Sequence, residues 1–403
     1  MKSEITRENP NALVAYPAII ALMLYVFCYQ FAYPFSSTLF LYVAFAGTVA
    51  WMVFCRKIYF SNQMLIMAFV SFVSVLGAFY TKVPEKGSRE AILTVVVWIL
   101  LIAFAQNAVL LGKLKKIICI CSFVVFLGVI IQYLFPDVVN NVLKVILRSD
   151  CYEQLMWSYE VDGAYAGFSA YTPDAAYFCA TLFGFAIFGW LQNKDLSLEN
   201  KAIRLIIIVL SVYAVILTSK RGVAVALVVS FIFTYTVWRK FSIKAIASVI
   251  GIVLAGTILI GIFSEQNEMI KLFLQRFDST DGDITTGRSE IWRHALENLS
   301  NSFWGMGTGA AYEIYDTGLH NIYLQLYYDH GLIGVMIYLL FFVNNLVHAV
   351  KRKEPMAIYI QLLMLVYGMS GNPIYSNSFF VVYTIFSVVS IGKQKQEAMT
   401  QSR

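Results

Sequence analysis

The chain has 403 residues, of which 59% are hydrophobic and only 13% are charged, and its mean hydropathy is +0.69. A soluble protein of this size needs far more charge on its surface, so the composition excludes a soluble enzyme and predicts an all-α polytopic membrane protein. The formal net charge of +6 is modest and lies mostly in short loops, so no nucleic-acid partner is expected.

Twelve apolar runs divide the chain, most of them near the length of about 18–22 residues that crosses a hydrocarbon core as a helix. The first run follows a mixed-charge start without a clear small-residue cleavage site, so we interpret it as a retained helix and not a signal peptide. We expect one integral membrane domain, residues 1–403. The predicted spans are 12–32, 37–55, 63–80, 91–108, 117–135, 172–191, 205–218, 222–238, 245–263, 331–349, 356–371 and 378–392.

The distribution of lysine and arginine predicts the orientation of these spans. With the N-terminus inside, the cytoplasmic segments hold 19 of the 30 basic residues, and each segment holds at least two. Both termini are therefore expected in the cytoplasm. The two long segments 136–171 and 264–330 are expected on the opposite side, so the bilayer is the first predicted partner.

The first long outer segment ends in GFSAYTPDAAYF, which starts at Gly167. Tyr171 and Asp174 lie here at the predicted outer start of a helix, where they are candidates for substrate binding. Asp174 can equally serve only as the cap of that helix, because an aspartate oxygen accepts the free backbone N–H groups of a first turn.

A second candidate site is TSKRG, between two apolar runs at an outer helix end. Lys220 and Arg221 can extend to lipid headgroups, as basic side chains at membrane borders often do. The positive-inside bias disfavours basic residues on this side, which favours an anion clamp instead. A guanidinium group binds phosphate oxygens in pairs and keeps its charge in a low-dielectric site.

The segment 264–330 is the largest outer segment and is expected to carry catalysis. NEMIKLFLQRF has the apolar face of an interfacial helix, and Ser289 is expected to cap a second short helix. Arg288 follows Gly287 at the start of that helix, where backbone N–H groups would add to an anion site. A solvated surface arginine is the alternative. On the second helix, an apolar stripe is expected, formed by Ile291, Ala295, Leu296 and Leu299.

No metal site is predicted. The pair Asp281 and Asp283 can hold a divalent ion, but in a Thr- and Gly-rich stretch it is more typical of a solvated turn. The six cysteines lack zinc-ligand spacing, and Cys151, in the first outer segment, has no expected disulfide partner.

The outer segment returns to the membrane through HNIYLQLYYDHGLIG, which starts at His320. Neutral imidazole accepts a proton near pH 7 without a large pKa shift, so His320 is the best candidate for proton transfer. Asn321 and Tyr323 can orient the imidazole or a sugar. The alternative is a histidine at a membrane interface, and Asp329 with His330 is interpreted as a second interfacial pair.

Three motifs, in this order, make the chain resemble the O-antigen polymerase and O-antigen ligase superfamily. They are SKRG at 219–222, TGRSEIW at 286–292 with WGMGTG at 304–309, and HNIYLQLYYDHGLIG at 320–334. About twelve spans and a large outer loop between late spans extend the resemblance over the whole layout. Each motif is weak alone, but their order is fairly specific to the superfamily.

The resemblance implies a GT-C-like, inverting glycosyltransferase of the bacterial inner membrane that needs no metal or other cofactor. Its donor would be a glycan linked to undecaprenyl pyrophosphate, and its active site would face the periplasm. Arg221 and Arg288 would hold the diphosphate, with Lys220 sharing the phosphate, and His320 would assist or orient the acceptor hydroxyl.

Within the superfamily, the compact outer loops and the GFSAYTPDAAYF segment favour a Wzy-type polymerase, with a chain-length regulator as a further candidate partner. The alternative is a ligase that transfers polymer to a lipid A core. A transporter is a third hypothesis, but it would need ionisable residues deep in several spans, and the predicted spans are nearly uncharged.

Overall fold

The computed structural model describes residues 15–28, 37–54, 60–106, 108–169, 171–193, 197–239, 265–278, 287–299, 303–312 and 318–388, with the single positions 247, 251 and 261. Within these ranges the chain forms helices and no strand. Among the described helices, seven are long and apolar enough to cross a membrane, and four shorter ones are apolar. This arrangement agrees with the predicted multi-pass membrane protein. The predicted span 245–263 lies almost wholly outside the described residues.

Contacts divide the chain into two compact units, each made of segments that are distant in sequence. The first unit contains residues 1–118, 291–347 and 371–403, and the second contains residues 119–290 and 348–370.

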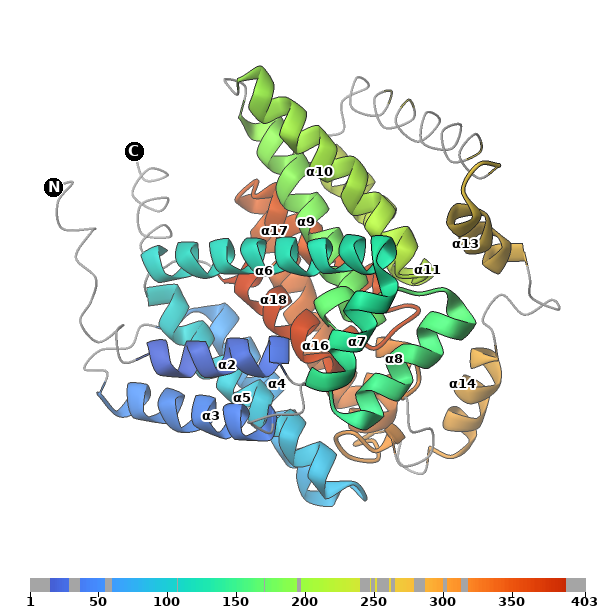
Figure 1. Ribbon diagram of the computed structural model, residues 1–403. Helices are drawn as coiled ribbons and strands as arrows, with labels where there is room; N and C mark the ends of the chain where they lie inside the picture. Colours follow the sequence, from blue (N-terminus) through green and yellow to red (C-terminus); the bar gives the residue numbers. More distant parts are fainter. Residues whose placement is uncertain are drawn as a thin grey trace, which may run out of the picture. The chain divides into compact units, whose positions relative to one another are not determined.

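In the first unit, α4 packs along α5, and α3 packs against both α2 and α5 (Figure 1). The buried side-chain amide of Gln63 links α4 to later parts of the unit. It donates to Asn345 of α16 and to the Ser387 carbonyl, at 2.6 Å each. The helices of this unit are α2 (Tyr16–Cys28), α3 (Ser37–Phe54), α4 (Asn62–Tyr80), α5 (Pro84–Gln106), most of α16 (Ile322–Lys351), η2 (Pro373–Tyr375) and α18 (Asn377–Ser387).

The helix α16 begins at Ile322, nine residues before the predicted span at 331–349. The extra turns carry Gln325, Asp329 and His330, which lower the local hydropathy but are all buried. Gly331 interrupts the helix with a φ of 61°, a conformation that glycine adopts without steric cost. Its neighbour is the backbone of Phe303, which a Cβ at this position would overlap.

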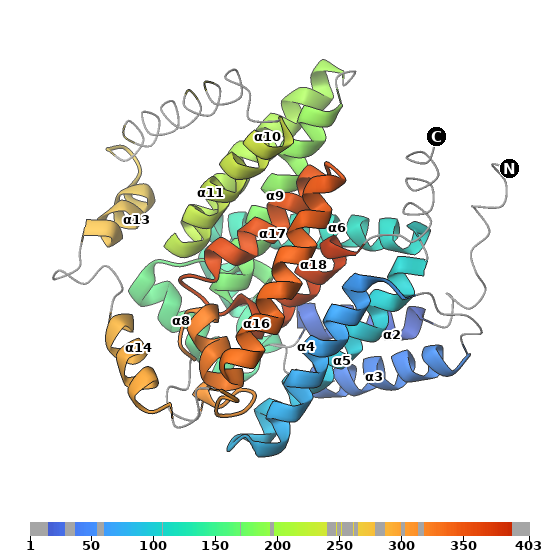
Figure 2. The ribbon, with the colours of Figure 1, turned by 180° about the vertical axis from the view of Figure 1, so that it is seen from behind.

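In the second unit, α9 packs along α10, and α11 packs along α17 (Figure 2). Glycine permits one of these close approaches, since a Cβ at Gly184 would lie 2.6 Å from the ring of Tyr359. The helices are α7 (Pro136–Ile146), α8 (Ser149–Asp162), η1 (Gly167–Ser169), α9 (Thr172–Gln192), α10 (Leu198–Leu217), α11 (Arg221–Trp238), α13 (Glu268–Asp278) and α17 (Pro355–Tyr367), while α6 (Ala108–Leu134) and α14 (Arg288–Glu297) cross the boundary between the units.

The described parts of the two long segments predicted to lie outside contain several helices. The segment 136–171 folds into α7 and α8, and the predicted helix at NEMIKLFLQRF is α13. Ile270 and Phe273 of α13 pack with Ile216 of α10, so this apolar face is covered by protein. The second predicted helix is α14, which begins at Arg288, so Ser289 lies in its first turn and is not its cap. In its predicted stripe Ala295 is buried, but Leu296 is 50% exposed.

Candidate functional site

Each of the three predicted catalytic residues either has a left-handed backbone conformation itself or follows a residue that has one within two positions. Ser219 precedes the Lys220–Arg221 pair with a φ of 59°, Gly287 precedes Arg288 with a φ of 84°, and His320 itself has a φ of 51°. A left-handed conformation costs an L residue about 1–2 kcal/mol, so the fold must enforce it at Ser219 and His320. Such strain is concentrated at functional sites, which makes these turns the first places to examine.

The TSKRG turn joins α10 to α11 in the second unit. Ser219 donates its hydroxyl to the Asp162 carbonyl at 3.2 Å, and the Tyr165 amide donates to the Leu217 carbonyl at 3.0 Å. Lys220 is the N-cap of α11 without a side-chain capping bond, and Arg221 is its first helical residue. The turn thus presents two half-buried cationic residues at a helix N-terminus, where the macrodipole favours an anion.

Gly222 permits close packing of α11 on the end of α17. A Cβ at Gly222 would overlap the Ser370 hydroxyl and lie 3.3 Å from the Tyr367 ring. Arg288 reaches the same place from α14, because its Nη1 donates to the Ser370 carbonyl at 2.9 Å. The start of α11 and the Arg288 guanidinium therefore meet at Ser370 within the second unit.

Arg288 is half-buried, and its burial lowers its pKa, an effect that the nearby Tyr367 opposes. A guanidinium remains charged despite such a shift. Burial weakens the competition of water for this cation, so an anion beside it would bind more strongly than at an exposed surface. The chemistry of Arg288 therefore suits phosphate oxygens, and its role in an anion site stays a prediction.

The start of α9 belongs to the same neighbourhood. Tyr171 is the N-cap of α9 and Asp174 lies in the first turn, so the alternative that Asp174 is the cap is wrong. Asp174 is only 4% exposed. Burial, and secondarily the charge of Asp174, raises the pKa of Tyr171 to about 12. Tyr171 therefore keeps its proton at physiological pH and can donate a hydrogen bond.

Tyr367 lies among these groups. Its hydroxyl is close enough to Tyr171, Arg288 and Asp174 to interact with them electrostatically. We call Tyr171, Asp174, Arg288, Tyr367 and Ser370 the arginine–tyrosine cluster. Tyr367 and Ser370 were not predicted. Their only sequence signal is the break GMSGNP after an apolar run, which indicates a helix end without specifying what it contacts.

His320 lies in the first unit, half-exposed, in a turn held from both sides. The Leu319 amide donates to Gln325 Oε1 at 2.8 Å, and the Leu319 carbonyl accepts from the Trp292 indole at 2.7 Å. Asn321 caps α16, because its Oδ1 accepts from the Tyr323 and Leu324 amides at 3.0 and 3.2 Å. These bonds fix the backbone that aims the imidazole.

Asp329 and His330 are not the interfacial pair that the sequence suggested, because they are 0% and 2% exposed. The Asp329 carboxylate accepts from the Gly309 and Ala311 amides at 3.2 Å each and from Gln325 Nε2 at 3.1 Å. Asp329 thus ties the WGMGTG loop to α16. Through Gln325, the same network reaches the Leu319 amide beside His320.

The structure brings Tyr171, Asp174 and Arg288 together and places the start of α11, with Lys220 and Arg221, beside Ser370 of the same cluster. It places His320, Asn321 and Tyr323 together at the start of α16 in the other unit. Tyr323 is half-buried there. The pair Asp281 and Asp283 lies outside the described residues.

Residues 206–339 match the family described as O-antigen ligase. The matched segment contains Arg221, Arg288 and His320. No curated protein matches the chain. Over that segment, the match supports the resemblance to the O-antigen polymerase and ligase superfamily that the three motifs indicate.

Proposed function

We propose that the protein is a Wzy-type polysaccharide polymerase, an inverting and metal-independent glycosyltransferase that joins oligosaccharide repeat units linked to undecaprenyl pyrophosphate. It works at the periplasmic face of the bacterial inner membrane. The single observation that supports this most is that the family match at 206–339 includes Arg221, Arg288 and His320, each at or just after a strained or glycine turn.

In the proposed reaction, an acceptor hydroxyl attacks the anomeric carbon of the donor sugar. The bond from that carbon to the diphosphate oxygen breaks, and undecaprenyl diphosphate leaves with the electron pair. Arg221 and Arg288 neutralise the charge that develops on the leaving diphosphate, and Lys220 shares it. Because a diphosphate is already a good leaving group, positioning and charge neutralisation provide most of the catalysis.

His320 accepts the proton of the attacking hydroxyl or orients that hydroxyl toward the donor sugar. Asn321 and Tyr323 assist beside it, and Tyr171 with Asp174 binds the substrate near Arg288. The half-buried Arg288 and the buried Asp174 supply a cation and a carboxyl group at this cluster.

A polymerase and a ligase share this chemistry and differ in the acceptor. The direct experiment mixes purified protein in liposomes with defined lipid-linked repeat units, with and without a lipid A core acceptor, and reads the products as a gel ladder. A ladder built from repeat units alone supports the polymerase. Product that forms only on the lipid A core contradicts the polymerase and supports the ligase.

A further inference from the structure

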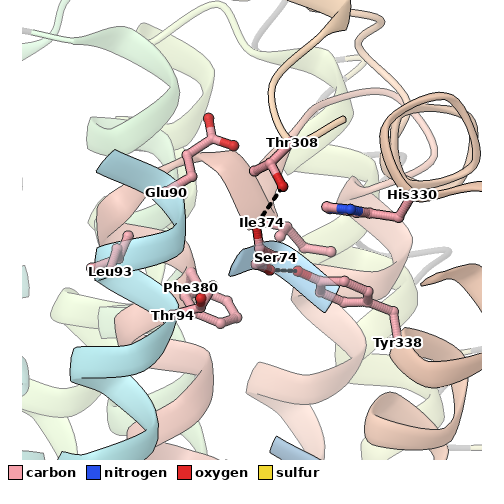
Figure 3. A pocket seen from close by; sticks show the side chains of 9 residues that line it. All are labelled: Ser74, Glu90, Leu93, Thr94, Thr308, His330, Tyr338, Ile374 and Phe380. Atoms are coloured by element: carbon pink, nitrogen blue, oxygen red, sulfur yellow. Dashed lines mark hydrogen bonds between the residues drawn. The ribbon is translucent and has the colours of Figure 1, made fainter. Parts of the chain in front are cut away.

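A small polar cavity lies inside the first unit, apart from the residues proposed to act on the substrate. Its volume is about 20 Å³, and Figure 3 shows the side chains around it. Glu90 of α5, Thr308 of the WGMGTG loop and His330 of α16 contribute its polar groups, with Ser74 and Tyr338. The remaining lining residues are Leu93, Thr94, Ile374 and Phe380.

Two ionisable side chains at this cavity carry buried atoms that no hydrogen bond satisfies. Both ring nitrogens of His330 lack a hydrogen-bond partner among the described residues, as does Oε2 of Glu90. His330 is 2% exposed, and its ring stacks on Tyr338 with 5.7 Å between ring centres. Leaving a buried polar group unpaired costs roughly 1–3 kcal/mol, so three such atoms around one cavity indicate a missing ligand.

The surrounding polar groups are already fixed by the fold. The Thr308 hydroxyl donates to the Ser74 carbonyl at 2.7 Å, which leaves its oxygen able to accept. The Ser74 and Tyr338 hydroxyls bond each other at 3.0 Å. Gly77 leaves room for this arrangement, because a Cβ there would overlap Thr308 Oγ1 and lie 3.3 Å from His330 Nδ1. The cavity is therefore built by glycine and by hydrogen bonds, and is not a gap of loose packing.

The size and polarity of the cavity decide what it can hold. One water molecule needs roughly 10–15 Å³ of such space and two to four polar partners, so a cavity of about 20 Å³ admits one water and excludes any larger organic ligand. A bare cation fits less well, because a histidine ring with no metal-ligand cluster around it is a poor cation site. Among the described residues, no three His, Cys, Asp or Glu side chains gather for a metal.

We propose that this cavity binds one water molecule that bridges the Glu90 carboxyl group to the His330 ring, and that Glu90 carries a proton there. A neutral acid, a water and a neutral imidazole satisfy Glu90 Oε2 and one ring nitrogen of His330 without placing a separated charge pair in an apolar interior. The charged groups close enough to interact with Glu90 are Asp329, Arg89 and Lys86.

The water would help to hold the WGMGTG loop, since Thr308 of this loop lines the cavity and the neighbouring Gly309 amide donates to Asp329. Glu90 and His330 thus become structural partners of the loop and of the kink at Gly331. Neither is part of the proposed transfer chemistry, so the inference stands whether the protein is a polymerase or a ligase.

The first test is an experimental structure of the full-length protein in lipid nanodiscs at a resolution that resolves ordered water. We expect one water peak within hydrogen-bonding distance, about 2.7–3.2 Å, of both the Glu90 carboxyl group and a His330 nitrogen. An empty cavity, or Glu90 in direct contact with His330, would overturn the proposal. The wild-type protein alone decides this result, so it does not depend on a variant that folds.

The second test is infrared spectroscopy of the same preparation at neutral pH, where only a protonated carboxyl group gives a carboxylic acid C=O band. We expect such a band in the wild-type protein, its loss in Glu90→Gln, and its retention in Glu85→Gln. Glu85 lies exposed in the first turn of the same helix and is the matched control. Absence of the band in the wild type, or its persistence in Glu90→Gln, would refute a protonated Glu90.

Discussion

Replacing Arg288 by alanine should separate its role in stability from its role in catalysis. In the folded protein the side chain makes one charge-assisted hydrogen bond, from Nη1 to the Ser370 carbonyl at 2.9 Å. Such a bond contributes roughly 1.5–3 kcal/mol when buried. Because Arg288 is half-exposed, solvent screening reduces the expected loss of stability to about 1 kcal/mol.

The expected loss of activity is larger. If Arg288 holds the leaving diphosphate, its removal deletes a donor that acts in the transition state, which typically costs about 100- to 1,000-fold in rate, or ~2.7–4 kcal/mol. The assay is the initial rate of chain extension by purified variants in liposomes, paired with a thermal-unfolding measurement. Arg293→Ala is the control, because Arg293 lies exposed on the same helix and should keep the wild-type rate. A wild-type rate for Arg288→Ala would refute the diphosphate clamp.

Four further outcomes are expected. Arg221→Lys keeps a charge but loses the bidentate fork, so its extension rate should fall at least tenfold, and full activity would show that charge alone suffices. Asn321→Ala should lower stability by about 1 kcal/mol through loss of the α16 cap, and an unchanged unfolding temperature would argue against that cap. Asp329→Ala leaves three donors without their acceptor and should lower the unfolding free energy by about 3 kcal/mol or more, whereas near-native stability would contradict the network. Activity should survive EDTA, and a loss restored only by a divalent ion would contradict a metal-independent reaction.

Hydropathy predicted where most of the described apolar helices lie, though not all their ends, because a membrane span needs a long apolar run and little else. It failed at the start of α16, where Gln325, Asp329 and His330 interrupt the apolar pattern. Gln325 donates to Asp329, and Asp329 also accepts from the Gly309 amide of the WGMGTG loop. These hydrogen bonds make it possible to bury the two polar side chains. Hydropathy assigns a penalty to each residue separately, so it cannot detect polar groups that satisfy one another inside the protein.

The candidate site was predictable in part for a similar reason. Arg221, Arg288 and His320 stood out because basic residues and a histidine are unexpected at an outer membrane border. Tyr367 and Ser370 carry no such signal. Ser370 is 82 residues from Arg288 in sequence, and only the packing of α17 beside α11 brings its carbonyl to the guanidinium.

The measurement that tests the central claim most directly follows the leaving group. Purified protein in liposomes without an ion gradient is given defined lipid-linked repeat units, and both chain extension and free undecaprenyl diphosphate are quantified. The account predicts one diphosphate released for each repeat joined, with both products lost in His320→Ala. Movement of the lipid-linked units across the bilayer with no diphosphate release would contradict it and identify a transporter.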